Sequence, residues 1–341
     1  MSSVLVLSEY DEGVPLAFMM RSEKHIVRTS SRRFPEIFAQ GTNPSRIARP
    51  SQMLEQFDLI LSTTPFVDEE MVRNKRLIGA GRFHAKLLDP AYLDSIRASL
   101  LAHTSSFALE GQRVVVTTWV SPKGYSPTHL LSLTYDRLMD GDKGPLTYAG
   151  SVHRLVKESK LFEEIFPPLL PLLQKVGFIG PLTAYLIVNE SETFLYSLSP
   201  VLTSFLLQGM SELSRKPLFS LFWGSLDGDQ AEIQSDEYAL CVSLSCSMPK
   251  ENESYVSPPL EALPHLWLRD AKETPEGFLT MGTSGLLGVV SARGVSIKEC
   301  KRRISRTLSN GVKSPEVQYR SDIGDDAEER FNVLRSWGWL I

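Results

Sequence analysis

The chain contains 341 residues, of which 42% are hydrophobic and 22% charged, and its formal net charge is −4. This length allows two or three domains that share a substantial core, and the composition is typical of a soluble globular protein. The slightly acidic balance excludes a protein that is basic overall, so any contact with nucleic acid must come from a local cluster of cations.

The N-terminal residues and the cysteines predict the compartment. The chain starts without a basic segment, and its first apolar run is too short for a signal peptide. No apolar run reaches roughly 18 residues without charges, so we expect no membrane span. Cys241, Cys246 and Cys300 lack the paired spacing of metal ligands, which favours reduced thiols. We therefore expect a soluble, cytoplasmic protein.

The first 88 residues alternate between short apolar runs and amphipathic stretches, which predicts an open α/β domain. A continuous apolar run such as residues 4–7 is typical of a strand that is buried on both faces of a parallel sheet. The first turn lacks G-x-G-x-x-G, so a dinucleotide site is not indicated. The expected strands are 4–7, 25–28, 57–61 and 76–79, with helices ending at Met20 and spanning 69–73.

The middle of the chain is predicted to form mainly strands. Residues 184–188 and 194–198 pair as a hairpin through the turn 189–192, and prolines interrupt an apolar helix over 161–176. The other expected elements are a helix-like stretch at 92–103, strands at 111–120 and 128–135, a polar loop at 136–151 and a surface loop at 250–259.

Three stretches carry a resemblance to a known family. Residues 79–87 read G-A-G-R-F-H-A-K-L, residues 144–150 read G-P-L-T-Y-A-G, and residues 287–324 contain S-A-R-G, a basic helix and Y-R-S-D-I-G. They resemble glycinamide ribonucleotide synthetase (phosphoribosylamine–glycine ligase) of the ATP-grasp superfamily. The matching patterns of that family are D-x-G-P-N-T-G-G-M-G, T-A-x-G and Y-R-x-D-I-G.

The resemblance implies an α/β fold with α+β elements, a reduced ATP-grasp-like fold. We expect an N-terminal pre-ATP-grasp-like α/β domain at 1–88, a reduced central domain at 89–250 and a C-terminal synthetase-like α/β module at 251–341. The small ATP-binding lobe is expected to be largely missing, because one helix-like stretch fills the interval between Lys86 and Gly111.

The strand that holds Mg²⁺–ATP in the family is altered. Residues 195–201 read L-Y-S-L-S-P-V where the family has L-E-F-N-P-R, so the magnesium ligands Glu and Asn fall on Ser197 and Ser199. Magnesium prefers anionic oxygen ligands, and two neutral hydroxyls are a poor substitute. No carboxylate lies between Glu192 and Glu212. We therefore expect neither a metal site nor a cofactor.

The predicted active site lies in the loop 136–151 and the C-terminal module. Asp136 and His153 are the proposed general bases, and glycines in the loop allow its backbone amides to approach an anion. The residues predicted to bind substrate or phosphate are Arg137, Lys143, Gly144, Thr147, Ser151, Arg293, Tyr319, Arg320 and Asp322.

Each of these interpretations has a structural alternative. The loop is also ordinary turn chemistry, each histidine alone is more often a core residue, and Arg320 and Asp322 also fit a structural ion pair. Two runs of cations fit either a solvated face or contacts to a phosphate backbone. They comprise Arg21, Lys24, Arg28, Arg32, Arg33, Arg46 and Arg49 in the first domain, and Lys301, Arg302, Arg303 and Arg306 in the last.

A synthetase-like fold without magnesium ligands suits a substrate that arrives already activated. Bacteriophage amino-acid:DNA transferases are associated with such sequences, and this resemblance implies a function. The chain would be an ATP-independent transferase that attaches glycine or another amino acid to pyrophosphate-activated 5-hydroxymethyluracil in phage DNA, a thymidine hypermodification in an infected bacterial host.

Two alternatives stay open. The first is a non-catalytic ATP-grasp-like binding or scaffold protein, and the second is an ATP-dependent amine ligase that resembles glycinamide ribonucleotide synthetase. The sequence makes no prediction about the oligomeric state.

Overall fold

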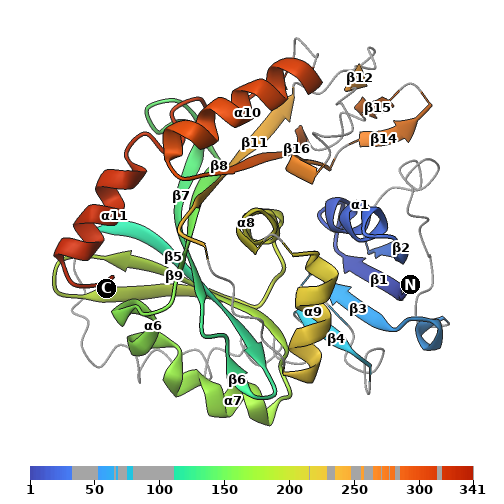
Figure 1. The fold of residues 1–341 in the computed structure, drawn as a ribbon, viewed down its shortest axis with the longest axis horizontal. Coiled ribbons are helices and arrows are strands. Elements are labelled where there is room, and N and C mark those ends of the chain that lie inside the picture. The colour runs from blue at the N-terminus through green and yellow to red at the C-terminus, as the bar shows by residue number, and fades with distance from the viewer. Residues whose placement is uncertain are drawn as a thin grey trace.

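The computed structural model describes most of the chain, and Figure 1 shows its arrangement. The predicted helix 69–73, the segment 80–87, the stretch 92–103 and Arg33, Arg46 and Arg49 lie outside the described residues. Those described are 1–32, 53–64, 67, 75–79, 111–214, 216–228, 235–246, 255–256, 264–269, 271–275, 277–280, 285–312 and 317–340.

The N-terminal residues form a four-stranded parallel sheet, the N-terminal sheet, in the order β2-β1-β3-β4. Its central strand is apolar on both faces, so Val4 and Val6 pack toward helix α1 while Leu5 and Leu7 join a small separate cluster. This confirms the predicted open α/β unit. The bounds are β1 Ser3–Ser8, α1 Val14–Ser22, β2 Ile26–Ser31, η2 Leu54–Gln56, β3 Leu59–Ser62 and β4 Leu77–Gly79.

A ten-stranded sheet, the large sheet, curves through the rest of the molecule (Figure 1). Its main path runs β10-β9-β5-β7-β8-β11-β16-β13, and all of its pairs are antiparallel. The bounds are β5 Gln112–Ser121, β6 Gly124–Tyr125, β7 His129–Met139, β8 Lys143–Val156, β9 Gly180–Val188, β10 Thr193–Ser199, β11 Tyr238–Cys246, β13 Leu266–Leu268, β16 Leu286–Gly294 and β17 Val317–Gln318.

The predicted hairpin of β9 and β10 is confirmed, and so is the proline-interrupted helix, which the structure divides into three short helices. The large sheet takes strands from both sides of residue 250 and does not divide at that predicted domain boundary. A further small sheet contains β12 Tyr255–Val256, β14 Ala271–Thr274 and β15 Gly277–Thr280, so β12 forms within the predicted surface loop 250–259.

The prediction of a loop at 136–151 is wrong. Strand β7 continues to Met139 and β8 begins at Lys143, so this segment is a β-hairpin whose strands pair irregularly. Gly141 and Asp142 have positive φ angles of 69° and 56°, as tight hairpin turns require. Its polar residues resemble a loop because much of the hairpin is exposed, and it lacks the apolar alternation of a half-buried strand.

Helices cover both faces of the large sheet. Its outer face packs on α6, α7, α10 and α11, and its inner face packs on α8, α9 and the N-terminal sheet (Figure 1). Among the described residues, no helix is long and apolar enough to cross a membrane. The bounds are α6 Lys160–Ile165, η3 Pro167–Leu169, α7 Leu170–Lys175, α8 Ser204–Ser214, α9 Leu218–Asp227, α10 Ile297–Gly311 and α11 Ala327–Ser336.

Helix α8 approaches the inner face closely because Gly209 has no side chain. A Cβ atom built on Gly209 would lie 2.6 Å from Cδ2 of His153 on β8. The His153 ring cannot move away easily, since serines hold both of its nitrogens. The contact between α8 and β8 therefore requires glycine at this position.

We predict that Gly209→Ala lowers the free energy of unfolding by about 1–3 kcal/mol, because overpacking at a fixed neighbour outweighs the better helix propensity of alanine. Urea unfolding measures this difference. Ser211→Ala on the same helix is the control and is expected to be neutral or stabilising. A Gly209→Ala protein as stable as wild type would contradict the close approach.

Candidate functional site

Three tyrosines and an ion pair gather on the inner face of the large sheet, and we call this group the tyrosine cluster: Tyr148, Tyr185 and Tyr196 with Arg113 and Asp136. Arg113 Nη1 donates to Asp136 Oδ2 at 2.7 Å. The rings of Tyr185 and Tyr196 are 6.1 Å apart. The negative charge of Asp136 raises the pKa of the phenols of all three tyrosines.

The phenols of this cluster are neutral at physiological pH. Burial raises the pKa of Tyr148, Tyr185 and Tyr196 above their ordinary value, and the carboxylate of Asp136 raises them further. A neutral phenol donates a hydrogen bond, so the cluster offers hydroxyl donors and the Arg113 guanidinium, whose side chain is 58% exposed. This set suits an anionic or carbonyl group.

The backbone of Tyr148 is strained. Its φ angle of 57° lies in the left-handed region, which bulky residues rarely adopt. Ser243 Oγ donates to the Tyr148 carbonyl at 2.9 Å, and the Tyr148 ring packs edge-on against Phe205 with ring centroids 4.8 Å apart. In the motif that 144–150 resembles, Tyr148 falls on a glycine. Such strain is found preferentially at functional sites, which favours this cluster as one.

Mg²⁺–ATP does not fit strand β10. Ser197 pairs with Tyr185 and Ser199 with Thr183 on β9, so this part of the two strands supplies hydroxyls. The neighbouring carboxylate, Asp136, already pairs with Arg113. Within the described ranges, no group of three or more His, Cys, Asp and Glu side chains is arranged to hold a metal ion. Neutral hydroxyls with one paired carboxylate are a poor donor set for magnesium.

His153 lies in the interior of the protein. It is 2% exposed, its Nδ1 is 2.6 Å from Ser132 Oγ, and its Nε2 is 2.7 Å from Ser151 Oγ. Burial lowers its pKa to about 3. Both predicted residues, His153 and Ser151, are therefore engaged with each other, and the imidazole is buried with both nitrogens bonded to serines. Asp136 is the predicted base that stays at the inner surface.

Arg320 and Asp322 join the segment after β17 to the tip of the β7–β8 hairpin. Arg320 is 5% exposed and donates to Asp322 at 2.5 Å, to Asp142 at 3.1 Å and to the Arg137 carbonyl at 3.2 Å. The backbone N–H of Gly141 donates to Asp322 at 2.8 Å. The segment 319–322 thus makes the structural ion pair that the sequence left open.

Other predicted residues are more exposed. Thr147 and Lys143 are exposed on the hairpin, and Tyr319 is 45% exposed. Arg137 Nη1 donates to the carbonyl of Gly144 at 2.7 Å, across the hairpin. Apart from Arg293, the predicted set therefore divides between the tyrosine cluster, the interior and the β7–β8 hairpin with the adjoining segment 319–322.

Arg293 lies elsewhere, at the far end of α8. It donates to the Glu212 carbonyl at 3.1 Å, and the Glu212 side chain binds His265 and Ser291. Sequence reasoning missed Glu212 and His265, because neither belongs to a motif. A carboxylate in the apolar pattern of α8 was the one available signal.

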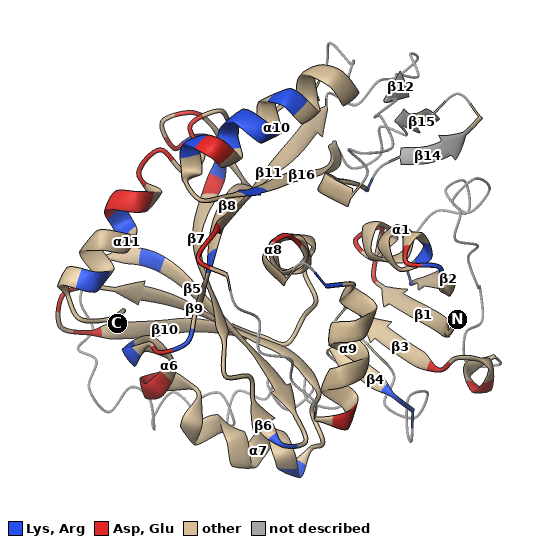
Figure 2. Cartoon of the chain, viewed as in Figure 1, with Lys and Arg blue, Asp and Glu red and all other residues tan. Residues whose placement is uncertain are grey.

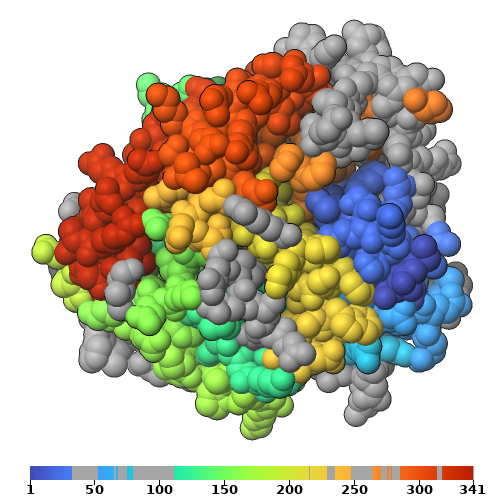
Figure 3. All heavy atoms as spheres, viewed as in Figure 1, coloured from blue at the N-terminus to red at the C-terminus, as the bar shows by residue number. Residues whose placement is uncertain are grey.

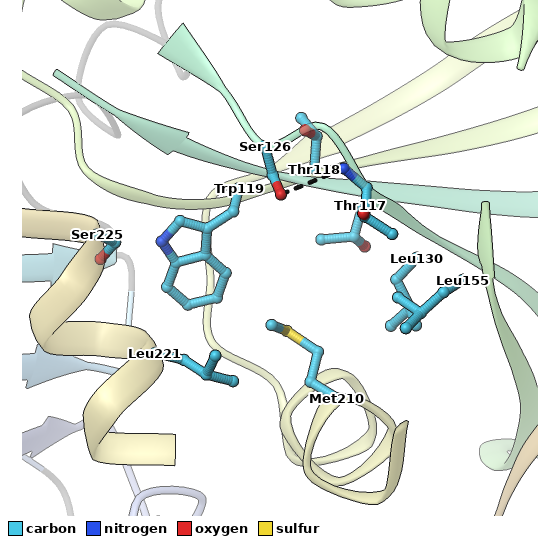
Figure 4. Close-up of a pocket in the computed structure, with 10 residues that line it drawn as sticks. Thr117, Thr118, Trp119, Ser126, Leu130, Leu155, Met210, Leu221 and Ser225 are labelled. Carbon is cyan, nitrogen blue, oxygen red and sulfur yellow. Dashed lines mark hydrogen bonds between the residues drawn. The ribbon is translucent and has the colours of Figure 1, made fainter. Parts of the chain in front are cut away.

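A small cavity lies between the large sheet and helices α8 and α9 (Figure 4). Its volume is about 50 Å³, which leaves room for a few water molecules. Thr117 and Thr118 of β5, Met210 of α8 and Leu221 of α9 line it. None of the predicted site residues lines this cavity, and it is not the candidate site.

Comparison with solved structures places the fold. The chain is similar to phosphoribosylamine–glycine ligase from Thermotoga maritima, with a TM-score of 0.72 and 15% sequence identity over 94% of this chain and 99% of that chain. It is also similar to the biotin carboxylase domain of a single-chain bacterial carboxylase, with a TM-score of 0.64 and 9% identity over 99% of this chain and 100% of that one.

N5-carboxyaminoimidazole ribonucleotide synthetase from Thermotoga maritima gives a TM-score of 0.56 at 10% identity, over 94% of this chain and 100% of that chain. No protein-family model and no curated protein matches the sequence. The chain therefore has an ATP-grasp-like fold, as the resemblance predicted.

The contacts at the hairpin tip make a stability prediction. Arg320→Ala leaves Asp142 and Asp322 without their cation, and we expect a loss of about 1–3 kcal/mol of unfolding free energy, since both carboxylates are partly exposed. Chemical denaturation measures this loss. Lys143→Ala, on the same hairpin, is the control with little expected effect.

The same contacts make the free energy of unfolding depend on pH. Burial alone would raise the pKa of Asp322, but hydrogen bonds from Arg320 and Gly141 lower it below its ordinary value of 3.8. Its contribution to stability is present above the unfolded-state pKa and is lost as the pH falls through the folded-state pKa. Arg320→Ala should therefore weaken the acid dependence of unfolding below about pH 4. An unchanged dependence would show that these contacts contribute nothing to stability.

Proposed function

We propose that this protein is an ATP-independent amino-acid transferase, which attaches the amine of glycine to a pyrophosphate-activated 5-hydroxymethyluracil base in phage DNA. The C–N bond forms at the base methylene as the C–O bond to pyrophosphate breaks, and pyrophosphate leaves with the electron pair. The observation that supports this proposal is a combination of two features. The fold is ATP-grasp-like and similar to a ligase named for glycine, and strand β10 carries neutral hydroxyls, a poor donor set for magnesium.

The activated base explains how such a fold works without ATP. A ligase uses ATP to activate a carboxylate, whereas here the pyrophosphate on the base already provides a good leaving group. The protein must then supply anion-binding groups, a base for the ammonium and access to the methylene. A base stacked in a duplex exposes its methylene poorly, so the proposal includes a base taken out of the stack.

The tyrosine cluster provides part of this chemistry. Arg113 and the neutral phenols of Tyr185 and Tyr196 are donors for an anionic group, and Asp136 is the predicted base beside them. Arg137 and Lys143 on the exposed hairpin extend the cationic surface. Because Asp136 is held by Arg113, this group also fits the alternative of a scaffold that binds a small molecule without catalysis.

Helix α10 provides a surface for the DNA backbone. Figure 2 shows its cations along the outer side of the molecule. Lys301 pairs with Asp325 and Arg303 with Glu299, whereas Arg302 and Arg306 are exposed and pair with no carboxylate among the described residues. Two exposed cations one turn apart on the same helix suit successive phosphates.

We predict that Arg302→Glu combined with Arg306→Glu weakens binding to duplex DNA and reduces the salt slope of log K by about 2, because each cation releases roughly one counterion. Fluorescence anisotropy over a series of salt concentrations measures both effects. Lys175→Glu on α7 is the matched control. Equal slopes in wild type and the double variant would contradict a role of α10 in DNA binding.

The activity itself is tested with labelled glycine and duplex DNA that carries pyrophosphorylated hydroxymethyluracil. We expect a glycine-bearing nucleoside and free pyrophosphate, with no effect of removing ATP or of chelating divalent cations. Mass analysis of the digested nucleosides detects the product. Product that forms only when ATP is added would support the ligase alternative. If folded protein forms no product with any amino acid, the scaffold alternative is supported.

A further inference from the structure

A second polar group lies where α8, β13 and β16 meet, and we call it the Glu212–His265 pair. His265 Nδ1 and Glu212 Oε1 are 2.6 Å apart, and Ser291 Oγ donates to the same oxygen at 2.7 Å. Arg293 donates to the Glu212 carbonyl at 3.1 Å. Figure 3 shows that N-terminal residues (blue), the α8–α9 region (yellow) and C-terminal residues (orange) meet on one face of the molecule.

The two members of the pair differ sharply in burial. The Glu212 side chain is 4% exposed, whereas that of His265 is 44% exposed. Among the described residues, none is hydrogen bonded to Nε2 of His265. A carboxylate that accepts from Nδ1–H fixes the neutral tautomer whose lone pair is on Nε2. The buried acid thus holds the ring while its reactive nitrogen is left for another molecule.

Charges on the surrounding elements tune this imidazole. The hydrogen bond to Glu212 raises the pKa of His265 above its ordinary value of 6.5, while burial and the positive charges of Arg293 and Arg303 oppose the rise. Arg293 lies on β16, and Arg303 lies on α10. Burial instead lowers the pKa of His129 to about 4 and that of His153 to about 3. Of these three histidines, His265 is the one whose pKa is raised, and its side chain is half-exposed.

We propose that His265 is the general base that accepts the proton of the amine nucleophile, that Glu212 is its positioning residue, and that Arg293 and Arg303 attract an anionic group of the same substrate. This inference rests on the proposed function, because it names the base that the transfer needs. It favours His265 over Asp136, which Arg113 holds, and over His153, which the interior encloses.

The proton and electron balance is simple. The ammonium of glycine gives one proton to Nε2 of His265, and the resulting imidazolium is stabilised by the Glu212 carboxylate. The free amine attacks the base methylene, the C–N bond forms, and pyrophosphate leaves with the electrons of the C–O bond. The secondary ammonium of the product keeps the two remaining protons, and His265 returns the first proton to water. The guanidinium groups attract the carboxylate of glycine or the pyrophosphate.

The first experiment follows the imidazole directly. In protein labelled with ¹³C-histidine, the resonance that is missing from His265→Asn is assigned to His265, and its titration is compared with that of His25, whose pKa is lowered by burial. We expect His265 to titrate above His25, and Glu212→Gln to shift its midpoint down by about 1 unit. Glu163→Gln, on the exposed side of α6, is the control.

The second experiment measures transfer of glycine to the activated DNA as a function of pH. The acid limb of the kcat/KM profile should follow the titration midpoint of His265 and shift with that midpoint in Glu212→Gln. His265→Asn should lower kcat/KM about 100-fold. His25→Asn should keep the wild-type profile. A further assay replaces glycine with aminomethane, which lacks the carboxylate, to decide whether the arginines attract this carboxylate or the pyrophosphate. A higher KM for aminomethane than for glycine would show that the arginines attract the carboxylate of the amino acid.

The outcomes are distinguishable. An active wild type with an active, folded His265→Asn protein and an unchanged pH profile would overturn the role of His265 alone. An inactive wild type would overturn the transferase and this role in it. A His265 midpoint that does not respond to Glu212→Gln would overturn the positioning role of Glu212.

Discussion

The packing of helix α8 against the inner face of the large sheet is the constraint on which both polar groups depend. Its apolar residues, including Leu206 and Met210, join the large sheet to the N-terminal sheet in one core. Phe205 at one end packs on Tyr148, and Glu212 at the other end binds His265. Because the helix lies this close only through a glycine facing β8, its position fixes the tyrosine cluster and the Glu212–His265 pair together.

Hydroxyl groups are frequent among the described polar residues of the inner face. Thr117 and Thr183 bond each other at 3.0 Å, and serines on β7 and β8 hold a buried histidine. Such groups are satisfied by their neighbours and carry no net charge, so they cannot balance a divalent cation and a triphosphate. The ATP-grasp-like fold of this chain thus presents a shaped polar surface that is rich in neutral hydroxyl groups.

Local patterns predicted the elements well and the polar contacts poorly. A continuous apolar run identified β1, and alternating apolar residues with an intervening turn identified β9 and β10. Burial on one or both faces of a strand produces such patterns in consecutive residues. The hairpin at 136–151 was missed because its exposed strands carry no such pattern. The enclosure of His153 follows from the antiparallel register that sets it opposite Ser132, and its partner Ser151 lies two residues away on the same strand. A register of that kind is a tertiary property.

The Glu212–His265 pair also could not be predicted from local sequence patterns. Its members are 53 residues apart in the chain, and Ser291 is 79 residues from Glu212, so no spacing rule connects them. Desolvation connects them, because a carboxylate at a core position of α8 requires donors. His265, directly before β13, and Ser291 on β16 supply these donors. Once those donors are in place, one imidazole nitrogen is held and the other is left open, so satisfying a buried acid creates a proton acceptor at the surface. Proton transfer at such a pair is chemistry that these described charges can perform.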